Sequence, residues 1–106
     1  MNRQIFNKGK KITHAEHFDL INDIKSGKTY TVNFTAEQLE KIETYMLKSD
    51  GISHAKDDTI IIQTNNNKYT FTFYNGFVLL DEHINANNCI YKKERNFYKI
   101  PIEKLA

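Results

Sequence analysis

The second half of the chain is divided into short segments by runs of Asp, Asn and Gly, and this division most limits the possible folds. Segments of five to seven residues that are rich in Ile, Thr, Phe and Tyr are typical of β-strands. The pair Asn75-Gly76 favours a tight hairpin turn, because both residues tolerate positive φ. The sequence therefore predicts an antiparallel meander with strands at residues 52–56, 59–64, 68–74 and 77–82.

Further strands are predicted on both sides of this meander. Residues 29–34 alternate apolar and polar side chains, as a half-buried strand does. Residues 89–93 and 97–102 are expected to form a last hairpin around a turn at residues 94–96. Pro101 favours an edge or terminal position for the last of these strands.

Two capping boxes predict two helices. In residues 13–16 and again in residues 35–38, a Thr side chain can accept from the backbone three residues on, and a Glu or Gln can reach back. The first helix is expected to run to about residue 26, where Gly27 can end it in the left-handed conformation. The second helix is expected at residues 36–48.

The first predicted helix has an apolar side and an acidic side. Its apolar side consists of Phe18, Leu20, Ile21 and Ile24. The acidic residues on the opposite side are Glu16, Asp19 and Asp23. Such a stripe can meet a basic partner, although acids near a helix N-terminus are also stabilised by the helix itself.

The order of the elements indicates an α+β fold, with two helices packed on one face of an antiparallel β-sheet meander. The 106 residues are expected to form one domain, in which residues 1–12 are a basic N-terminal arm. The apolar runs are too short for a membrane span, and residues 1–11 lack the apolar segment of a signal peptide. A single cysteine, Cys89, excludes an internal disulfide, so we expect a cytoplasmic protein in a bacterium or an infected host cell.

The net charge of +2 conceals a separation of charge along the chain. Residues 1–12 carry +4 and residues 92–106 carry +3, so the stretch between them is acidic. The basic residues that can contact phosphates are Arg3, Lys8, Lys10 and Lys11 at one end and Lys92, Lys93, Arg95 and Lys99 at the other. The excess of Lys, Ile and Asn, whose codons are AT-rich, indicates a low-GC microbial or phage genome and weakens the lysines as a sign of phosphate binding.

Signatures of catalysis are weak. His14 and His17 can share a helix face and offer two metal ligands, but a third ligand is suggested only by the cluster at residues 81–83. Cys89 can serve as a nucleophile beside a histidine base, yet a buried strand cysteine is the more common role. We therefore predict no catalytic residue, metal or cofactor, and keep a small enzyme that uses His14, His17, His83 or Cys89 as a third hypothesis.

Residues 68–74 alternate aromatic and polar side chains and allow two interpretations. On an open sheet face, Tyr69, Phe71 and Phe73 can stack on bases of a nucleic acid. On a covered face they form the core. The core role is favoured, because these side chains are expected to face the helices.

Two stretches carry a resemblance to a known group of proteins. Residues 20–25 (LINDIK) followed by residues 30–32 (YTV) have the pattern of a first helix that leads into a strand. Residues 59–62 (TIII), the asparagines at 65–67 and Tyr69 have the pattern of a hairpin with an Asn-rich turn. Together they resemble the small phage anti-CRISPR inhibitors of Cas9, which implies a non-enzymatic protein that blocks a nuclease effector by binding it.

We therefore expect a small binding protein of phage or mobile-element type that inhibits a host defence effector, such as a CRISPR effector, by occupying its surface. The residues expected to contact this partner are Glu16, Asp19, Asp23, Lys92, Lys93, Arg95 and Lys99. The alternative is a nucleic-acid-binding accessory protein that uses the basic termini, including Arg3, Lys8, Lys10 and Lys11. A membrane partner is not expected.

Overall fold

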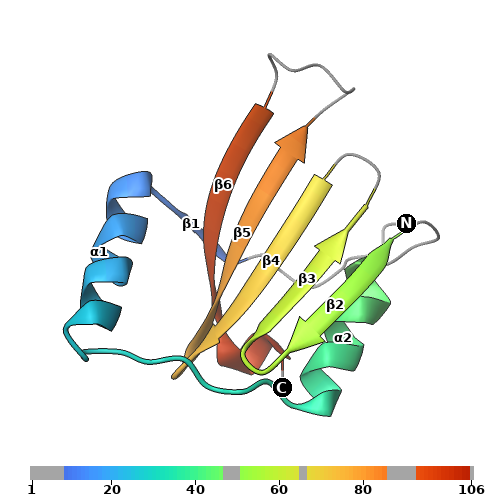
Figure 1. Cartoon of the computed structure of the whole chain (residues 1–106), viewed down its shortest axis with the longest axis horizontal. Helices are drawn as coiled ribbons and strands as arrows, with labels where there is room; N and C mark the ends of the chain where they lie inside the picture. The colour runs from blue at the N-terminus through green and yellow to red at the C-terminus, as the bar shows by residue number, and fades with distance from the viewer. Residues whose placement is uncertain (1–8, 47–50, 65–66, 86–92, 106) are drawn as a thin grey trace.

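The computed structural model describes residues 9–46, 51–64, 67–85 and 93–105. The helices in this part of the chain are α1 (His14–Lys25), α2 (Ala36–Met46) and the short 3-10 helix η2 (Ile102–Leu105) (Figure 1). The strands are β1 (Lys10–Ile12), β2 (Ile52–Lys56), β3 (Thr59–Gln63), β4 (Asn67–Tyr74), β5 (Phe77–Asn85) and β6 (Lys93–Pro101). None of the described helices is long and apolar enough to cross a membrane.

All six described strands form one antiparallel sheet in the order β1-β6-β5-β4-β3-β2. From β2 to β6 the chain is a meander, in which each strand pairs with the next along the sequence. Two of its turns lie where the sequence predicts them. Asp57 adopts a φ of 58° between β2 and β3, and Gly76 adopts a φ of 99° between β4 and β5. The predicted α+β class and antiparallel meander are therefore confirmed.

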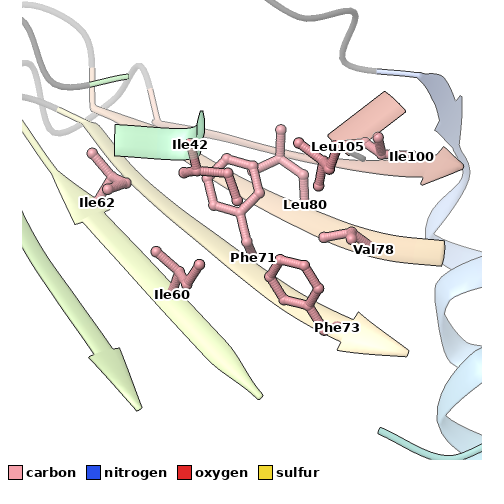
Figure 2. Close-up of a cluster of buried hydrophobic side chains, with 9 residues drawn as sticks. All are labelled: Ile42, Ile60, Ile62, Phe71, Phe73, Val78, Leu80, Ile100 and Leu105. Carbon is pink, nitrogen blue, oxygen red and sulfur yellow. The ribbon is translucent and has the colours of Figure 1, made fainter. Parts of the chain in front are cut away.

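One face of the sheet carries the main hydrophobic core. Alternate residues of β3 to β6 meet one residue of α2 and one of η2 there (Figure 2). The fully buried side chains are Ile42, Ile60, Ile62, Phe71, Phe73, Val78, Leu80, Ile100 and Leu105. Tyr69 packs against this cluster. The predicted core role of the aromatic residues in β4 is confirmed, and the full burial of Phe71 and Phe73 prevents these two rings from stacking on bases.

The opposite face of the sheet carries a smaller cluster beneath α1. Its buried members are Ile12, Tyr74, Leu79 and Phe97, and residues that pack against it include Leu20 and Ile24 of α1. Successive strand residues point to opposite faces, so Leu79 of this cluster and Leu80 of the main core mark the two sides. The two helices thus cover opposite faces of the sheet, whereas the sequence predicted both on one face. Figure 1 shows α1 beside β6 and α2 beside β2 and β3.

The segment between the helices carries the chain from one face to the other. Residues 29–34, predicted to be a strand, form only one isolated bridge, between Thr31 and Tyr74. The Phe34 N–H donates to the carbonyl of Asp57 in the β2–β3 turn, at 3.1 Å. The segment therefore passes the turn end of the sheet. Val32 and Phe34 pack against the main core, whereas Tyr30 is exposed.

Strand β6 is continuous and pairs with β5 along its whole length. The predicted hairpin around residues 94–96 is therefore wrong, because these residues lie inside the strand. Residues 89–92 of that hairpin lie outside the described residues. The polar run at residues 94–96 suggests a turn, but each of these residues faces a residue of β5, and Asn96 donates from Nδ2 to Glu82 Oε1 at 3.2 Å.

Residues 10–12 form β1, which pairs antiparallel with β6. Residues 10–12 of the predicted basic arm are thus a strand of the sheet, and residues 1–8 lie outside the described part. Gly9 precedes the strand with a φ of 82°, and a Cβ at this position would collide with the carbonyl oxygen of Lys99. A glycine lets the backbone approach β6 this closely. Lys10 and Lys11 of the basic N-terminal segment therefore lie beside the strand that carries Lys99.

Candidate binding surface on the first helix

A groove of about 380 Å³ lies between α1 and the sheet edge formed by β1 and β6. It is lined by Lys10, Ile12, Glu16, Asp19, Leu20, Asp23 and Lys99. Three carboxylates from the helix thus share the groove with two ammonium groups from the strands. The apolar lining comes from one residue of β1 and one of α1. Charges of both signs and apolar surface in one groove can hold a peptide-like ligand.

The start of α1 fixes the position of one acidic side chain. The Thr13 hydroxyl accepts from the Glu16 N–H at 3.1 Å, and Glu16 Oε1 accepts from the Thr13 N–H at 2.8 Å. This is the predicted capping box. The hydrogen bond from the Thr13 backbone lowers the pKa of Glu16, and the positive charges of Lys10 and Lys99 lower it further. Glu16 is therefore held as a carboxylate at the mouth of the groove.

The two lysines reach the groove through strand pairing. Lys10 of β1 lies directly opposite Lys99 of β6 in the register. Like charges at such positions repel each other, and the carboxylates of α1 that share the groove offset this repulsion. The Lys99 Nζ also lies 4.5 Å from the centre of the Phe77 ring, which favours the cation. The groove thus has positive side chains on its strand side and negative side chains on its helix side.

The groove contains four of the residues that the sequence predicts as partner contacts: Glu16, Asp19, Asp23 and Lys99. The sequence placed the acidic three on a fully exposed face, remote from the apolar side of the helix. Instead Asp23 is half-buried, and all three line a groove against the sheet. Packing through Leu20 and Ile24 turns the stripe toward the basic edge. The three acidic candidates and the basic candidate Lys99 therefore belong to one surface.

Phe18 lies outside the packed side of α1. Its side chain is 63% exposed, and no residue of α1 is buried. The prediction that Phe18 packs with Leu20 and Ile24 is wrong, because Phe18 lies about 120° around the helix from Ile24. The neighbouring residue Asp19 is exposed and lines the groove. Sequence reasoning did not single out Phe18 as a surface residue.

Arg95 lies apart from the groove, in an ion pair. Its Nε and Nη2 donate to the two carboxylate oxygens of Asp81 at 3.1 and 2.9 Å. These bonds raise the pKa of Arg95. The guanidinium also lies 5.0 Å from the centre of the Phe97 ring. Of the remaining basic candidates, Lys92 lies outside the described residues and Lys93 is described only as the first residue of β6.

The histidines of α1 contact an aromatic ring. His17 stacks on Phe97 with ring centres 3.9 Å apart, and His14 meets the same ring edge-on at 5.2 Å. Burial lowers the pKa of His17. Within the described residues, no group of three or more His, Cys, Asp or Glu side chains is arranged to hold a metal. The contacts seen for His14 and His17 are therefore contacts of packing, and Cys89 lies outside the described residues.

Comparison of this chain with models of protein families, with curated proteins and with solved structures gave no match.

Proposed function

We propose that this chain is a non-enzymatic binding protein whose α1 docks on a protein partner, with Phe18 at the centre of the contact. The supporting observation is the 63% exposure of this side chain on a helix that has no buried residue. Aromatic residues that become buried on binding supply much of the energy of protein interfaces. The charged groove between α1 and the sheet edge can then add selectivity for the partner through complementary charges.

The helix is ordered before any partner arrives. The capping box fixes its first turn, and Ser26 and Gly27 close its last turn by donating to the carbonyls of Asn22 and Ile24. The stacking of His17 on Phe97 fixes the helix against the sheet. A preformed contact surface lowers the ordering cost of binding.

The finer proposal is that the partner is a bacterial defence effector, such as Cas9, and that the protein is of phage or mobile-element origin and acts in the cytoplasm. This proposal is supported by the resemblance of residues 20–25 and 59–62 to anti-CRISPR inhibitors and by the low-GC composition. Blocking an effector needs only a binding surface and no chemistry. The partner-facing residues are Phe18 and the groove residues Glu16, Asp19, Asp23 and Lys99.

A cleavage assay tests this proposal. Purified Cas9 with its guide RNA is mixed with increasing amounts of the protein, and cleavage of a target DNA is measured. We expect cleavage to stop near equimolar protein. Phe18→Ala is expected to weaken inhibition at least about tenfold, which corresponds to an interface hot spot. Glu40→Lys on α2 is the control, because it changes an exposed residue far from α1 in sequence.

Two results would count against the proposal. Undiminished cleavage in molar excess of the protein would remove Cas9 as the partner. The proposal that α1 docks on some other protein partner is then tested by capture experiments with bacterial lysate. We expect the wild type and Glu40→Lys to capture the same protein partner, and Phe18→Ala to fail to capture it. Capture by all three would show that Phe18 is not part of the interface.

The alternative, nucleic-acid binding through the basic termini, also has a supporting observation. Lys10 and Lys99 lie opposite each other where the two ends of the chain pair, and Lys11 is exposed. A double substitution, Lys10→Glu with Lys11→Glu, tests it. The affinity for labelled oligonucleotides should then fall whatever their base sequence. The slope of log affinity against log salt concentration should become shallower. Unchanged binding would reject this use of the termini.

A further inference from the structure

A row of exposed side chains crosses the sheet on the face that also carries α1. The register of five neighbouring strands aligns one residue from each. The residues of this row, from β2 to β6, are Ile52, Gln63, Lys68, His83 and Arg95. All five are exposed. The four from Gln63 to Arg95 are hydrogen-bonding or basic, and at about 4.8 Å between strands they span about 14 Å.

The described helices leave this row uncovered. The buried residues beneath α1 come from β1, from the turn end of the β4–β5 hairpin and from β6 up to Phe97. In Figure 1, α1 lies beside β6, and no helix is drawn in front of β3 and β4. α2 packs on the other face, where Ile42 enters the main core. Within the described part of the chain, the row is therefore exposed to a ligand that lies across the strands.

On this face, the charged side chains of the described strands are mainly positive, whereas the acidic residues Glu16, Asp19 and Asp23 belong to α1. Lys56, Lys68 and Arg95 of the sheet point to it, since they alternate with residues that face the core. Asp81 is the carboxylate on the described strands of this face, and Arg95 and His83 both lie against it, His83 at 3.5 Å. The turn acids at residues 57–58 lie at the opposite end of β2 and β3 from the row.

Arg95 is positioned to donate to a further ligand. Two of its five N–H groups bond Asp81, through Nε and Nη2, so the donors on Nη1 are not used by this pair. The ring of Phe97 lies under the guanidinium at 5.0 Å and restricts its orientation. A guanidinium oriented in advance is suited to phosphate oxygens. His83 stands next to it in the row, and Lys68 follows on the next strand.

We propose that this row binds the phosphodiester backbone of a single-stranded nucleic acid laid across the strands. Evenly spaced donors without an exposed aromatic anchor suit a ligand with repeating negative charges better than a folded protein surface. A duplex is usually read by a helix or ribbon that enters a groove, and a flat sheet row is better suited to a single strand. The site lies apart from the proposed partner surface around Phe18 and does not depend on it.

Fluorescence anisotropy with a labelled single-stranded oligothymidylate of about 12 nucleotides tests the proposal. We expect Lys68→Glu to weaken binding about tenfold. The slope of log affinity against log salt concentration should become shallower by about the amount that one phosphate contact contributes. Lys28→Glu is the matched control, because it makes the same charge change at an exposed residue that follows α1. It should keep near-wild-type affinity. Phe18→Ala should also bind the oligonucleotide normally, which separates this site from the protein-partner surface.

Four results would overturn the proposal. The first is no measurable binding by the wild type at low salt. The second is an equal loss from Lys68→Glu and Lys28→Glu, which would show a response to net charge alone. The third is equal or tighter binding of a duplex of the same length. The fourth is displacement of the oligonucleotide by polyglutamate at equal charge, which would point to an acidic protein segment instead. Circular dichroism confirms that each variant is folded.

Discussion

Phe97 joins α1 to the sheet through the side chains around its ring. His17 stacks on it at 3.9 Å, His14 meets its edge at 5.2 Å, and the Arg95 guanidinium lies 5.0 Å away. Because α1 has no buried residue of its own, these contacts, together with Leu20 and Ile24, hold the helix on this face. The stacked histidine is also a titrating group, so attachment of the helix should depend on pH.

The direction of this dependence follows from the pKa of His17. Burial lowers it, and Arg95 and His14 add to the effect, while Asp81 opposes it. The unfolded state therefore takes up the proton first as the pH falls, and the free energy of unfolding decreases. The stability that neutral His17 contributes is fully present above the ordinary histidine pKa of about 6.5. It is lost as the pH drops through the lower pKa that His17 has in the folded state.

His17→Phe tests this linkage, because it keeps a ring against Phe97 and removes the titrating group. We expect the variant to lose less thermal stability than the wild type between about pH 7 and about pH 5. Melting followed by circular dichroism measures it. The same substitution at the exposed His54 of β2 should leave the pH dependence unchanged, and an unaltered slope in His17→Phe would contradict the linkage.

The spacing of residues along α1 assigns Phe18 and His17 to different sides of the helix, but their hydrophobicity does not. His17, Leu20 and Ile24 follow the spacing i, i+3, i+7, which marks one helix face. A wheel weighted by hydrophobicity places the phenylalanine on the same broad side as the histidine and does not separate the two. Burial on α1 is shallow, so a partly apolar imidazole is sufficient there and the larger ring stays outside.

At the scale of elements, local sequence motifs predict where helices begin and hairpins turn, but they do not predict which strands pair. The capping boxes and Asn75-Gly76 identify where the helices begin and where a hairpin turns, because the atoms involved are near in sequence. Strand β1 escapes detection, since its three residues gain their structure only from β6. Residues 94–96 are assigned to a turn for the converse reason, because a polar run stays in a strand when long pairing with β5 supports it.

Gly9 tests how closely β1 must approach β6. Gly9→Ala would place a Cβ against the Lys99 carbonyl oxygen at a φ of 82°. Gly27→Ala is the matched control, because its φ is 81° and nothing lies within 4 Å of the added atom. The control should lose about 1–2 kcal/mol of unfolding free energy from backbone strain alone. Gly9→Ala should lose clearly more in chemical denaturation, and equal losses would show that β1 adjusts without cost.

At the scale of the whole molecule, the two helices differ in how they take part in the fold. α2 contributes Ile42 to the main core, which extends through four strands and η2, whereas α1 lies on the smaller cluster of the other face. An amphipathic helix pattern indicates that a sheet covers one side of the helix, but it does not say which face of the sheet. That choice depends on the path of residues 29–34 around the turn end, which is a long-range property.

The two capping boxes allow a comparison of these helices with nearly identical chemistry. Thr35 and Gln38 exchange hydrogen bonds at 2.8 and 3.1 Å, as Thr13 and Glu16 do in α1. Replacing either threonine by alanine removes a cap worth about 0.5–2 kcal/mol. Because α2 is part of the main core, Thr35→Ala should lower the melting temperature by about 4–8 °C per kcal/mol.

Thr13→Ala should act differently, since α1 can open while the sheet and α2 remain folded. We expect a smaller change in melting temperature than in Thr35→Ala, together with faster amide hydrogen exchange confined to α1. Hydrogen exchange read by NMR resolves this, with the amides of β4 and β5 as the internal reference. Equal losses of melting temperature and slow exchange in α1 would mean that both faces unfold as one unit, so that the surface around Phe18 is as rigid as the core.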